Sequence, residues 1–186
     1  FDLRNGLKLA AQYLPVEANE GVLAECLKFI TGRMRGLFAD QGYKYDVIEA
    51  VLAEQAHNPA GAARAIKVLT DRVAQPDWED TLNGYSRCVR ITRDLKETYT
   101  VNEALLEAAE EKALFEAVSK LAEIEAGDMA SFFTAIDPLI APITSFFDEV
   151  LVMAEDEAVK HNRLAMLQKI AALAEGIADF SKLEGF

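Results

Sequence analysis

The sequence predicts an all-α protein, a bundle of about seven to nine helices with no sheet. Apolar residues recur at intervals of three and four along nearly the whole chain, and such intervals are typical of amphipathic helices. Only 10 glycines and 5 prolines interrupt the 186 residues, and 51% of them are hydrophobic, which is enough to bury a core. We expect one helical domain over residues 1–186, with possible halves at 1–100 and 101–186.

In the first half, local signals place the ends of three helices. The apolar stripe from Glu20 to Asp40 predicts one long helix, and Gly42 follows it as a stop. Asp46 and Glu49 have the spacing of a capping box, which predicts a helix start. The Asn58-Pro59 pair predicts the next start, because proline is tolerated in the first turn.

Further helices are predicted from similar signals. One begins near Asp77 and carries three arginines spaced by three, on one face. Asn102 is expected to cap a helix that continues to Gly127. The next starts at Asp128, is interrupted at Pro138 and Pro142, and resumes through 146–150. The last is expected at about 156–177, followed by a tail at 181–186.

The charge is strongly acidic but unevenly placed. The chain has 19 Lys and Arg against 31 Asp and Glu, a net charge of −12. Residues 1–100 contain 13 basic and 14 acidic residues, whereas residues 101–186 contain 6 and 17. This balance excludes a nucleic-acid binder coated in basic side chains, and no DNA partner is expected. Any RNA contact must therefore be local, and the first half could present a positive patch, especially at Arg33, Arg35, Arg87, Arg90 and Arg93.

Motifs for chemistry are missing from the sequence. Cys26 and Cys88 form no pair typical of zinc, and no glycine-rich loop for ATP is present. His161 follows Glu157 by four residues, but no third ligand is in prospect, so we expect no metal site. We therefore predict no catalytic residue and no cofactor in this fragment.

No uninterrupted apolar run reaches the length of a membrane span, and no signal peptide is recognisable. We expect a cytoplasmic protein. Because the first residue is Phe1, we interpret the chain as a fragment of a longer protein.

Several blocks of sequence, in order, resemble one family. They are FFDEVLVMAED at 146–156, KHNRLAML at 160–167 and ADFS at 178–181, with FITGRMRGL at 29–37, GYKYD at 42–46 and EAVLA at 49–53. Together they resemble the C-terminal region of the bacterial-type glycyl-tRNA synthetase beta subunit, over almost the whole chain. The chain departs from that pattern at Ser86-Arg87 and Arg90-Ile91, where the family often has Lys-Arg and Asn-Ile.

The resemblance implies a helical anticodon-binding domain, similar to the one in arginyl-tRNA synthetase. It also implies that ATP and glycine react at the separate alpha subunit, so this fragment would bind tRNA and catalyse nothing. The implied partners are glycine tRNA, the remainder of the beta subunit and the alpha subunit.

Glycine anticodons supply two cytosines, and unpaired bases are read by stacking and by hydrogen bonds to their edges. A carboxylate for the exocyclic amine, beside an Arg or Asn for the ring acceptors, would match a cytosine. Each candidate has a structural alternative as a solvated or ion-paired side chain, and for Asn162 we favour the structural role. The predicted RNA-binding residues are Arg33, Arg35, Arg87, Arg90, Arg93, Asn162 and Arg163.

Two other functions remain open from the sequence. The first is a non-catalytic helical module for protein interaction, for example subunit docking, which predicts dispersed arginines and an exposed apolar patch. The second is an enzyme that uses Asp148 and Glu155 as acid and base, which predicts a closed pocket with paired acids.

Overall fold

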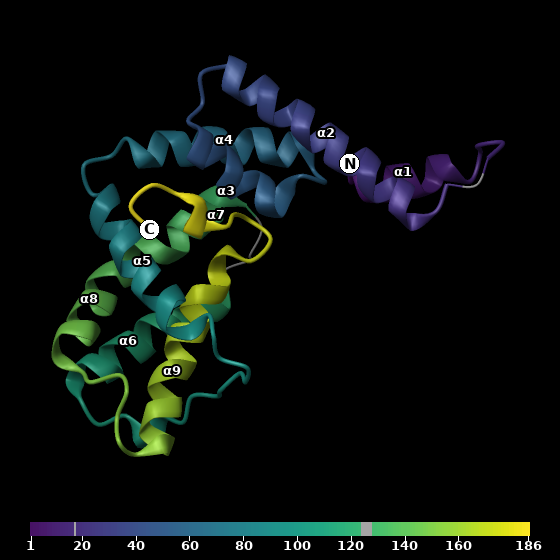
Figure 1. Ribbon diagram of the computed structural model, residues 1–186. Helices are drawn as coiled ribbons and strands as arrows, with labels where there is room; N and C mark the ends of the chain where they lie inside the picture. Colours follow the sequence, from purple (N-terminus) through teal and green to yellow (C-terminus); the bar gives the residue numbers. More distant parts are fainter. Residues whose placement is uncertain (17, 124–127) are drawn as a thin grey trace. The chain divides into compact units, whose positions relative to one another are not determined.

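The computed structural model describes residues 1–16, 18–123 and 128–186. These residues form nine α-helices and five short 3-10 turns, without a strand, so the all-α prediction is confirmed (Figure 1). The α-helices are α1 (Leu3–Ala11), α2 (Glu20–Asp40), α3 (Tyr45–Gln55), α4 (Pro59–Val73), α5 (Trp78–Thr92), α6 (Ala109–Ser119), α7 (Met129–Ile136), α8 (Ile140–Glu149) and α9 (Glu157–Ala171). The 3-10 turns are η1 (Glu103–Leu105), η2 (Lys120–Glu123), η3 (Asp137–Leu139), η4 (Ala172–Ala174) and η5 (Phe180–Lys182).

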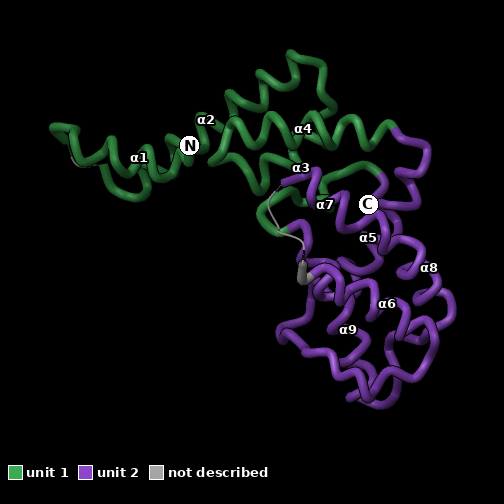
Figure 2. Tube along the Cα trace, turned by 180° about the vertical axis from the view of Figure 1, so that it is seen from behind, with its two compact units in different colours: residues 1–74, 175–184 green, residues 75–174, 185–186 purple. Residues whose placement is uncertain are grey.

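The chain divides into two compact units (Figure 2). Unit 1 contains residues 1–74 and 175–184, and unit 2 contains residues 75–174 and 185–186. The division thus lies between α4 and α5, rather than near residue 100 where the charge balance changes.

In unit 1, α2 begins and ends where the sequence predicts. Gly42 has a φ of 88°, which glycine adopts without strain. Its N–H donates to the carbonyl of Ala39, and the N–H of Tyr43 donates to the carbonyl of Phe38. The Tyr43 and Phe38 rings also pack edge to face. Together these contacts form a Schellman motif, which satisfies the last carbonyls of the helix.

The structure confirms the predicted cap of α4 but not the predicted capping box of α3. Asn58 caps α4 as predicted, because its side chain accepts from the N–H of Gly61 at 3.1 Å. The predicted capping box at Asp46 and Glu49 is wrong. The N-cap of α3 is Lys44, which makes no side-chain cap, and Asp46 accepts from the backbone N–H of Glu184 instead. A partner far along the chain replaced the local one.

The C-terminal segment of unit 1 returns to α3 and completes its core. The side chain of Gln55 donates to the carbonyl of Ile177 at 2.8 Å, and the N–H of Asp179 donates to the carbonyl of Ala50 at 2.8 Å. Residues 175–184 therefore belong with α3, although more than 120 positions separate them in the sequence. The buried apolar side chains of this core include Val47, Ile48, Val51, Ile66, Leu69, Ile177, Phe180 and Leu183.

Unit 2 is built around α9. Residues 162–167 of this helix are all buried, which is typical of a helix that is packed on every side. The helices α5 and α6 both pack against it, and α8 packs against α5 and α6. The segment α7–η3–α8 supplies the aromatic part of the core, where Phe132 packs edge to face on Tyr85 at 5.3 Å between ring centroids.

Three predicted boundaries in unit 2 need correction. Asn102 caps only the short turn η1, and the chain is extended before α6 begins at Ala109. The predicted stop at Gly127 lies outside the described residues. Pro142 does not interrupt α8, because it occupies the first turn, where no intrahelical N–H bond is lost. The last helix ends at Ala171, with η4 after it, so the expected helix over 156–177 is too long.

One described segment, Met129–Glu149, is long and apolar enough for a membrane span by length and composition alone. The 3-10 turn η3 divides this segment, and its large side chains Phe132, Ile136, Ile143 and Phe146 are buried in unit 2. Packing in the protein core accounts for its apolar composition.

Candidate nucleic-acid interface

The most distinctive polar feature of unit 2 is a guanidinium group stacked on an aromatic ring. Arg87 of α5 lies over the ring of Phe147 of α8, with 4.3 Å between the guanidinium carbon and the ring centroid. A cation in this position is attracted by the electrons of the ring face. The side chain of Arg87 remains 40% exposed, so the stacked guanidinium is accessible to a ligand.

A carboxylate lies beside this stacked pair. Asp148 follows Phe147 in α8, and its Oδ1 lies 3.5 Å from the guanidinium of Arg87. The side chain of Asp148 is 58% exposed, so this ion pair is open to solvent and contributes little to stability. A hydrogen-bond acceptor and a set of hydrogen-bond donors therefore stand next to each other at the surface.

The stacked pair is anchored to the core through its aromatic ring. Phe147 packs edge to face on Phe146, with 5.7 Å between ring centroids, and Phe146 is fully buried. This contact gives the Phe147 ring, on which the Arg87 guanidinium lies, a fixed neighbour in the core.

A second arginine on α5 repeats the arrangement. Arg90 lies one turn after Arg87 and is exposed, and its guanidinium carbon lies 5.4 Å from the ring centroid of Phe186. Arg87 and Arg90 share a helix face because they are separated by three positions. We call Arg87, Arg90, Phe147, Asp148 and Phe186 the arginine platform.

The packing of α5 gives the arginine platform a rigid base. The hydroxyl of Tyr85 donates to the carbonyl of Ala171 at 2.8 Å, which ties α5 to the end of α9. Gly84 approaches α8 closely, since a Cβ there would lie 3.3 Å from Ile140. Cys88 is fully buried between the two arginines in sequence, and burial raises the pKa of its thiol to about 12. This cysteine is therefore a packed core residue and not a nucleophile.

The other predicted RNA-binding residues lie in different surroundings. Arg93 ends α5, is exposed, and lies 3.7 Å from Asp94. In unit 1, Arg35 donates two hydrogen bonds to Glu49 of α3, and the pairing raises the pKa of Arg35. Arg33, two positions before Arg35, is exposed and pairs with no acid among the described residues.

Asn162 and Arg163 of α9 make polar contacts with other segments of unit 2. The Oδ1 of Asn162 accepts from the backbone N–H of Asn102 at 2.6 Å, and its Nδ2 finds no partner among the described residues. Arg163 is 8% exposed; it pairs with Glu111 of α6 and donates to the carbonyl of Leu151 at 2.9 Å. This last contact ties α9 to the segment that follows α8.

The alternative chemistries have no assembled site in the described residues. The Nε2 of His161 lies 3.2 Å from the carboxylate of Glu157, and no group of three or more potential metal ligands occurs in the part of the chain that the structure describes. Asp148 pairs with Arg87, whereas Glu155 is exposed in the segment between α8 and α9.

The electrostatics around the arginine platform are unusual for a nucleic-acid site. Unit 2 contains nine Lys and Arg against nineteen Asp and Glu in its sequence. Phosphate attraction can therefore come only from local groups of basic side chains, and stacking is expected to contribute to any affinity for RNA. Single-stranded RNA suits this balance, because its unpaired bases can leave the backbone and stack on planar groups.

The arginines of α5 are predictable from the sequence, but their aromatic partners are not. Phe147 and Phe186 carry no signal in the sequence beyond their aromatic character. The i, i+3 spacing of Arg87 and Arg90 was the only local indication. The partners come from α8 and from the end of the chain, which no periodicity within α5 can indicate.

A strand-free helical unit with exposed stacked guanidinium groups has the features of a helical RNA-binding domain. The chain belongs to the DALR anticodon binding domain family, which matches residues 81–178, more than half of its length. The match begins within α5 and continues through α9, so it includes Arg87, Arg90, Phe147 and Asp148 of the arginine platform.

Similar proteins extend the likeness to nearly the whole chain. The chain is 34% identical over 185 residues to the glycine–tRNA ligase, chloroplastic/mitochondrial 2, of Arabidopsis thaliana, with 97% of this chain and 17% of that protein covered. It is 36% identical over 169 residues to the glycine–tRNA ligase beta subunit of Geotalea daltonii, with 88% and 24% covered. The corresponding subunit of Anaeromyxobacter dehalogenans is 34% identical over 192 residues, with 99% and 26% covered. The chain thus spans about a quarter of the bacterial proteins.

Proposed function

We propose that this chain binds the anticodon loop of glycine tRNA, as the tRNA-binding domain of a glycine–tRNA ligase beta subunit. The observation that carries the proposal is the accessible guanidinium of Arg87, stacked on Phe147 and adjacent to Asp148, inside the region that matches the DALR family. The relatives named as glycine–tRNA ligases support the identity of the tRNA.

The proposed mechanism of base recognition combines stacking and hydrogen bonding at the arginine platform. An unpaired base stacks on the free face of the Arg87 guanidinium, whose other face is covered by Phe147. Asp148 then accepts a hydrogen bond from the exocyclic amine of a cytosine, while the N–H groups of the guanidinium donate in their own plane to a phosphate or to a neighbouring base. Arg90 on Phe186 offers a second plane one helical turn away.

In this proposal the chain contributes binding and no catalysis. Activation of glycine with ATP takes place at the alpha subunit, and the chain's other partners are the remainder of the beta subunit and the alpha subunit. The proposal includes a cytoplasmic location, as for a bacterial translation enzyme. Recognition at the anticodon would orient the tRNA, so that its acceptor end reaches a distant catalytic site.

Titration of the chain with fluorescent glycine tRNA tests the proposal. We compare the unchanged chain with the double variant Arg87→Ala, Arg90→Ala. Loss of one or two stacking planes, each worth roughly 1–3 kcal/mol, should weaken binding by about tenfold or more at low salt. The part of the loss that comes from phosphate attraction should shrink as salt is raised.

The matched control is Lys28→Ala with Arg64→Ala, which removes two exposed positive charges from unit 1. An equal loss in this control would mean that bulk charge, rather than the arginine platform, binds the tRNA. Unchanged affinity of the platform variant at low salt would remove Arg87 and Arg90 from the site. A second tRNA with both anticodon cytosines replaced by uracils should bind more weakly, and equal binding would indicate backbone contact without base reading.

A further inference from the structure

The hairpin of α1 and α2 in unit 1 exposes an apolar surface that its own fold does not cover. None of the nine residues of α1 is buried. An isolated helix of this length is marginal in water. Here it packs against α2, and the N–H of Leu3 donates to the carbonyl of His57 at 2.7 Å. Tyr13, just after α1, is 82% exposed, and Leu9 and Leu14 are also exposed.

The N-terminal part of α2 also lacks buried residues. Its first buried residue is Met34, in the fourth turn. Val22, Cys26 and Phe29 are exposed and follow one another at spacings of four and three, so they share one face of the helix. Phe29 is 71% exposed, which is exceptional for an aromatic side chain on a helix of this length.

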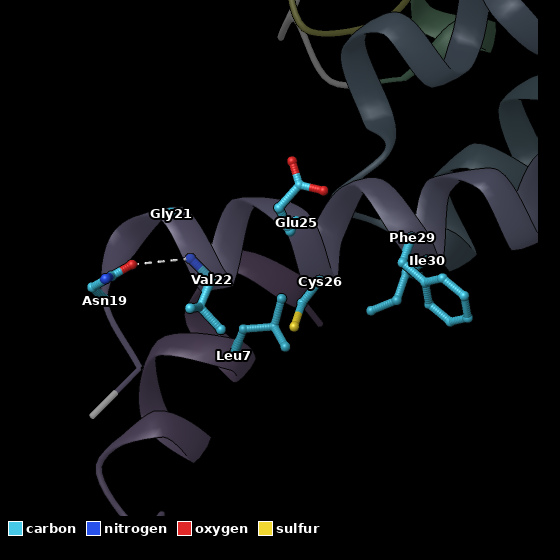
Figure 3. A pocket seen from close by; sticks show the side chains of 8 residues that line it. All are labelled: Leu7, Asn19, Gly21, Val22, Glu25, Cys26, Phe29 and Ile30. Carbon is cyan, nitrogen blue, oxygen red and sulfur yellow. Dashed lines mark hydrogen bonds between the residues drawn. The ribbon is translucent and has the colours of Figure 1, made fainter. Parts of the chain in front are cut away.

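These residues line a groove between the two helices, with a volume of about 670 Å³. Figure 3 shows Leu7 of α1 lying beside Val22 and Cys26, with Phe29 and Ile30 further along α2. Glu25 also lines the groove, but its carboxylate is directed away from Leu7, and Asn19 is engaged as the N-cap of α2, where it accepts from the N–H of Val22 at 3.1 Å. The surface offered to an occupant is therefore almost entirely apolar. Apolar protein side chains suit it, whereas a nucleic acid backbone does not.

The similar proteins are much longer than this chain, and their additional residues are a source of such apolar side chains. This chain spans between 17% and 27% of the glycine–tRNA ligases that it matches, so their polypeptides contain several times more residues than those seen here. A segment of the same polypeptide is held near the groove at high effective concentration. It can dock on a small patch, whereas a separate protein needs an interface of roughly 1,000 Å² or more.

We propose that the α1–α2 groove is an intramolecular docking surface, filled by apolar side chains from the part of the full-length subunit that lies outside these 186 residues. The groove would fix the anticodon-binding region to the rest of the subunit. This inference depends on the relation to the longer ligases and not on the arginine platform, so either proposal can fail alone.

Cys26 provides a direct probe of occupancy, because it lines the groove and is a free, exposed thiol in this chain. The full-length subunit is treated with N-ethylmaleimide for increasing times, and the Cys26 peptide is quantified by mass spectrometry. The same polypeptide in concentrated guanidinium chloride gives the rate for the uncovered thiol. With the groove filled, labelling of native Cys26 should be slower by roughly tenfold or more, since it requires the docked segment to open.

The variant Phe29→Asp introduces a charge into the groove and should expel the docked segment, so that Cys26 labelling accelerates several-fold. Since Phe29 is already exposed here, the substitution removes no buried contact from unit 1. The matched control is Lys28→Asp, at an exposed neighbouring position that does not line the groove, and it should leave the protection intact.

Rapid labelling of Cys26 in the native full-length subunit would overturn the proposal, as would protection that Phe29→Asp does not change. Protection that grows with protein concentration would identify a second copy as the occupant, and protection that requires added tRNA would identify the RNA. Both results also reject an intramolecular segment. The affinity of the Phe29→Asp subunit for glycine tRNA reports on the arginine platform separately.

Discussion

Arg163 of α9 and Glu111 of α6, which are 52 positions apart in the sequence, form an ion pair almost completely removed from water. The carboxylate also accepts from the backbone N–H groups of Glu107 and Ala108, at 2.7 and 2.8 Å, and so closes the start of α6. The guanidinium also donates to the carbonyl of Leu151. The pair therefore joins three segments of unit 2.

Removing one partner of this pair should strongly destabilise unit 2. In Arg163→Met the carboxylate of Glu111 stays buried without its cation, and breaking a buried pair in this way costs about 3–5 kcal/mol. Urea denaturation followed by circular dichroism measures the free energy of unfolding. Arg93→Met, at an exposed position on α5, is the control and should change it by less than about 1 kcal/mol. A similar small change for Arg163→Met would show that the pair contributes little.

Glu111 should also make the protein sensitive to acid. Burial opposes ionisation of its carboxyl, but Arg163 and the two backbone N–H groups outweigh burial, so its pKa lies below the ordinary value of 4.5. A carboxyl with a lowered pKa in the folded state stabilises the fold above the unfolded pKa, and this stability is lost as the pH falls through the folded pKa. Acid titration of Glu111→Gln should therefore show a smaller loss of stability below about pH 4.5 than the unchanged protein. Glu103→Gln, an exposed control, should follow the unchanged protein; identical curves for all three would contradict the assignment.

The two cysteines of this chain should react differently with a thiol reagent. Burial raises the pKa of Cys88 to about 12, so near pH 8 it remains a protonated, inaccessible thiol, whereas Cys26 is exposed. We expect one reactive thiol in the native 186-residue chain and two after denaturation, with Cys26→Ser abolishing the native reaction. Fast native reaction in Cys26→Ser would show that α5 does not hold Cys88 in the core.

Asp148→Asn should relax the choice of base while preserving binding. A carboxylate only accepts, and so favours the exocyclic amine of cytosine, whereas an amide can also donate to the O4 of uracil. The ratio of dissociation constants for cytosine and uracil anticodons should fall, by an amount equivalent to roughly 1–3 kcal/mol. Glu149→Asn, at the next position, is the control. A ratio that Asp148→Asn leaves unchanged would exclude Asp148 from base reading.

Local chemistry made several elements predictable. The periodicity of α2, the glycine stop at Gly42 and the caps at Asn58 and Asp128 involve groups within four residues of one another, and all four predictions are confirmed. The capping box at Asp46 failed although its spacing was correct. The side chain of Asp46 found a donor at Glu184, and that of Glu49 found Arg35. Spacing specifies which contacts a chain permits, but competition with distant groups selects among them.

The candidate site shows even more clearly that local sequence does not identify long-range partners. Arg35, Arg87 and Arg163 are equivalent in sequence, as arginines on predicted helix faces. In the fold, Arg35 pairs with Glu49, Arg163 is buried against Glu111, and Arg87 is presented on Phe147. No local pattern distinguishes the three, because each fate depends on a partner from another helix.

By itself, then, the amino-acid order determined that this protein is helical, where most helices start, and that any contact with RNA must use a few local arginines against an acidic background. Tertiary structure alone decided which arginines remain available and which apolar faces stay uncovered. The physical reason is the range of the interactions. Caps and periodicity act within a turn or two of helix, whereas ion pairs, stacking and burial join groups that only the folded chain brings together.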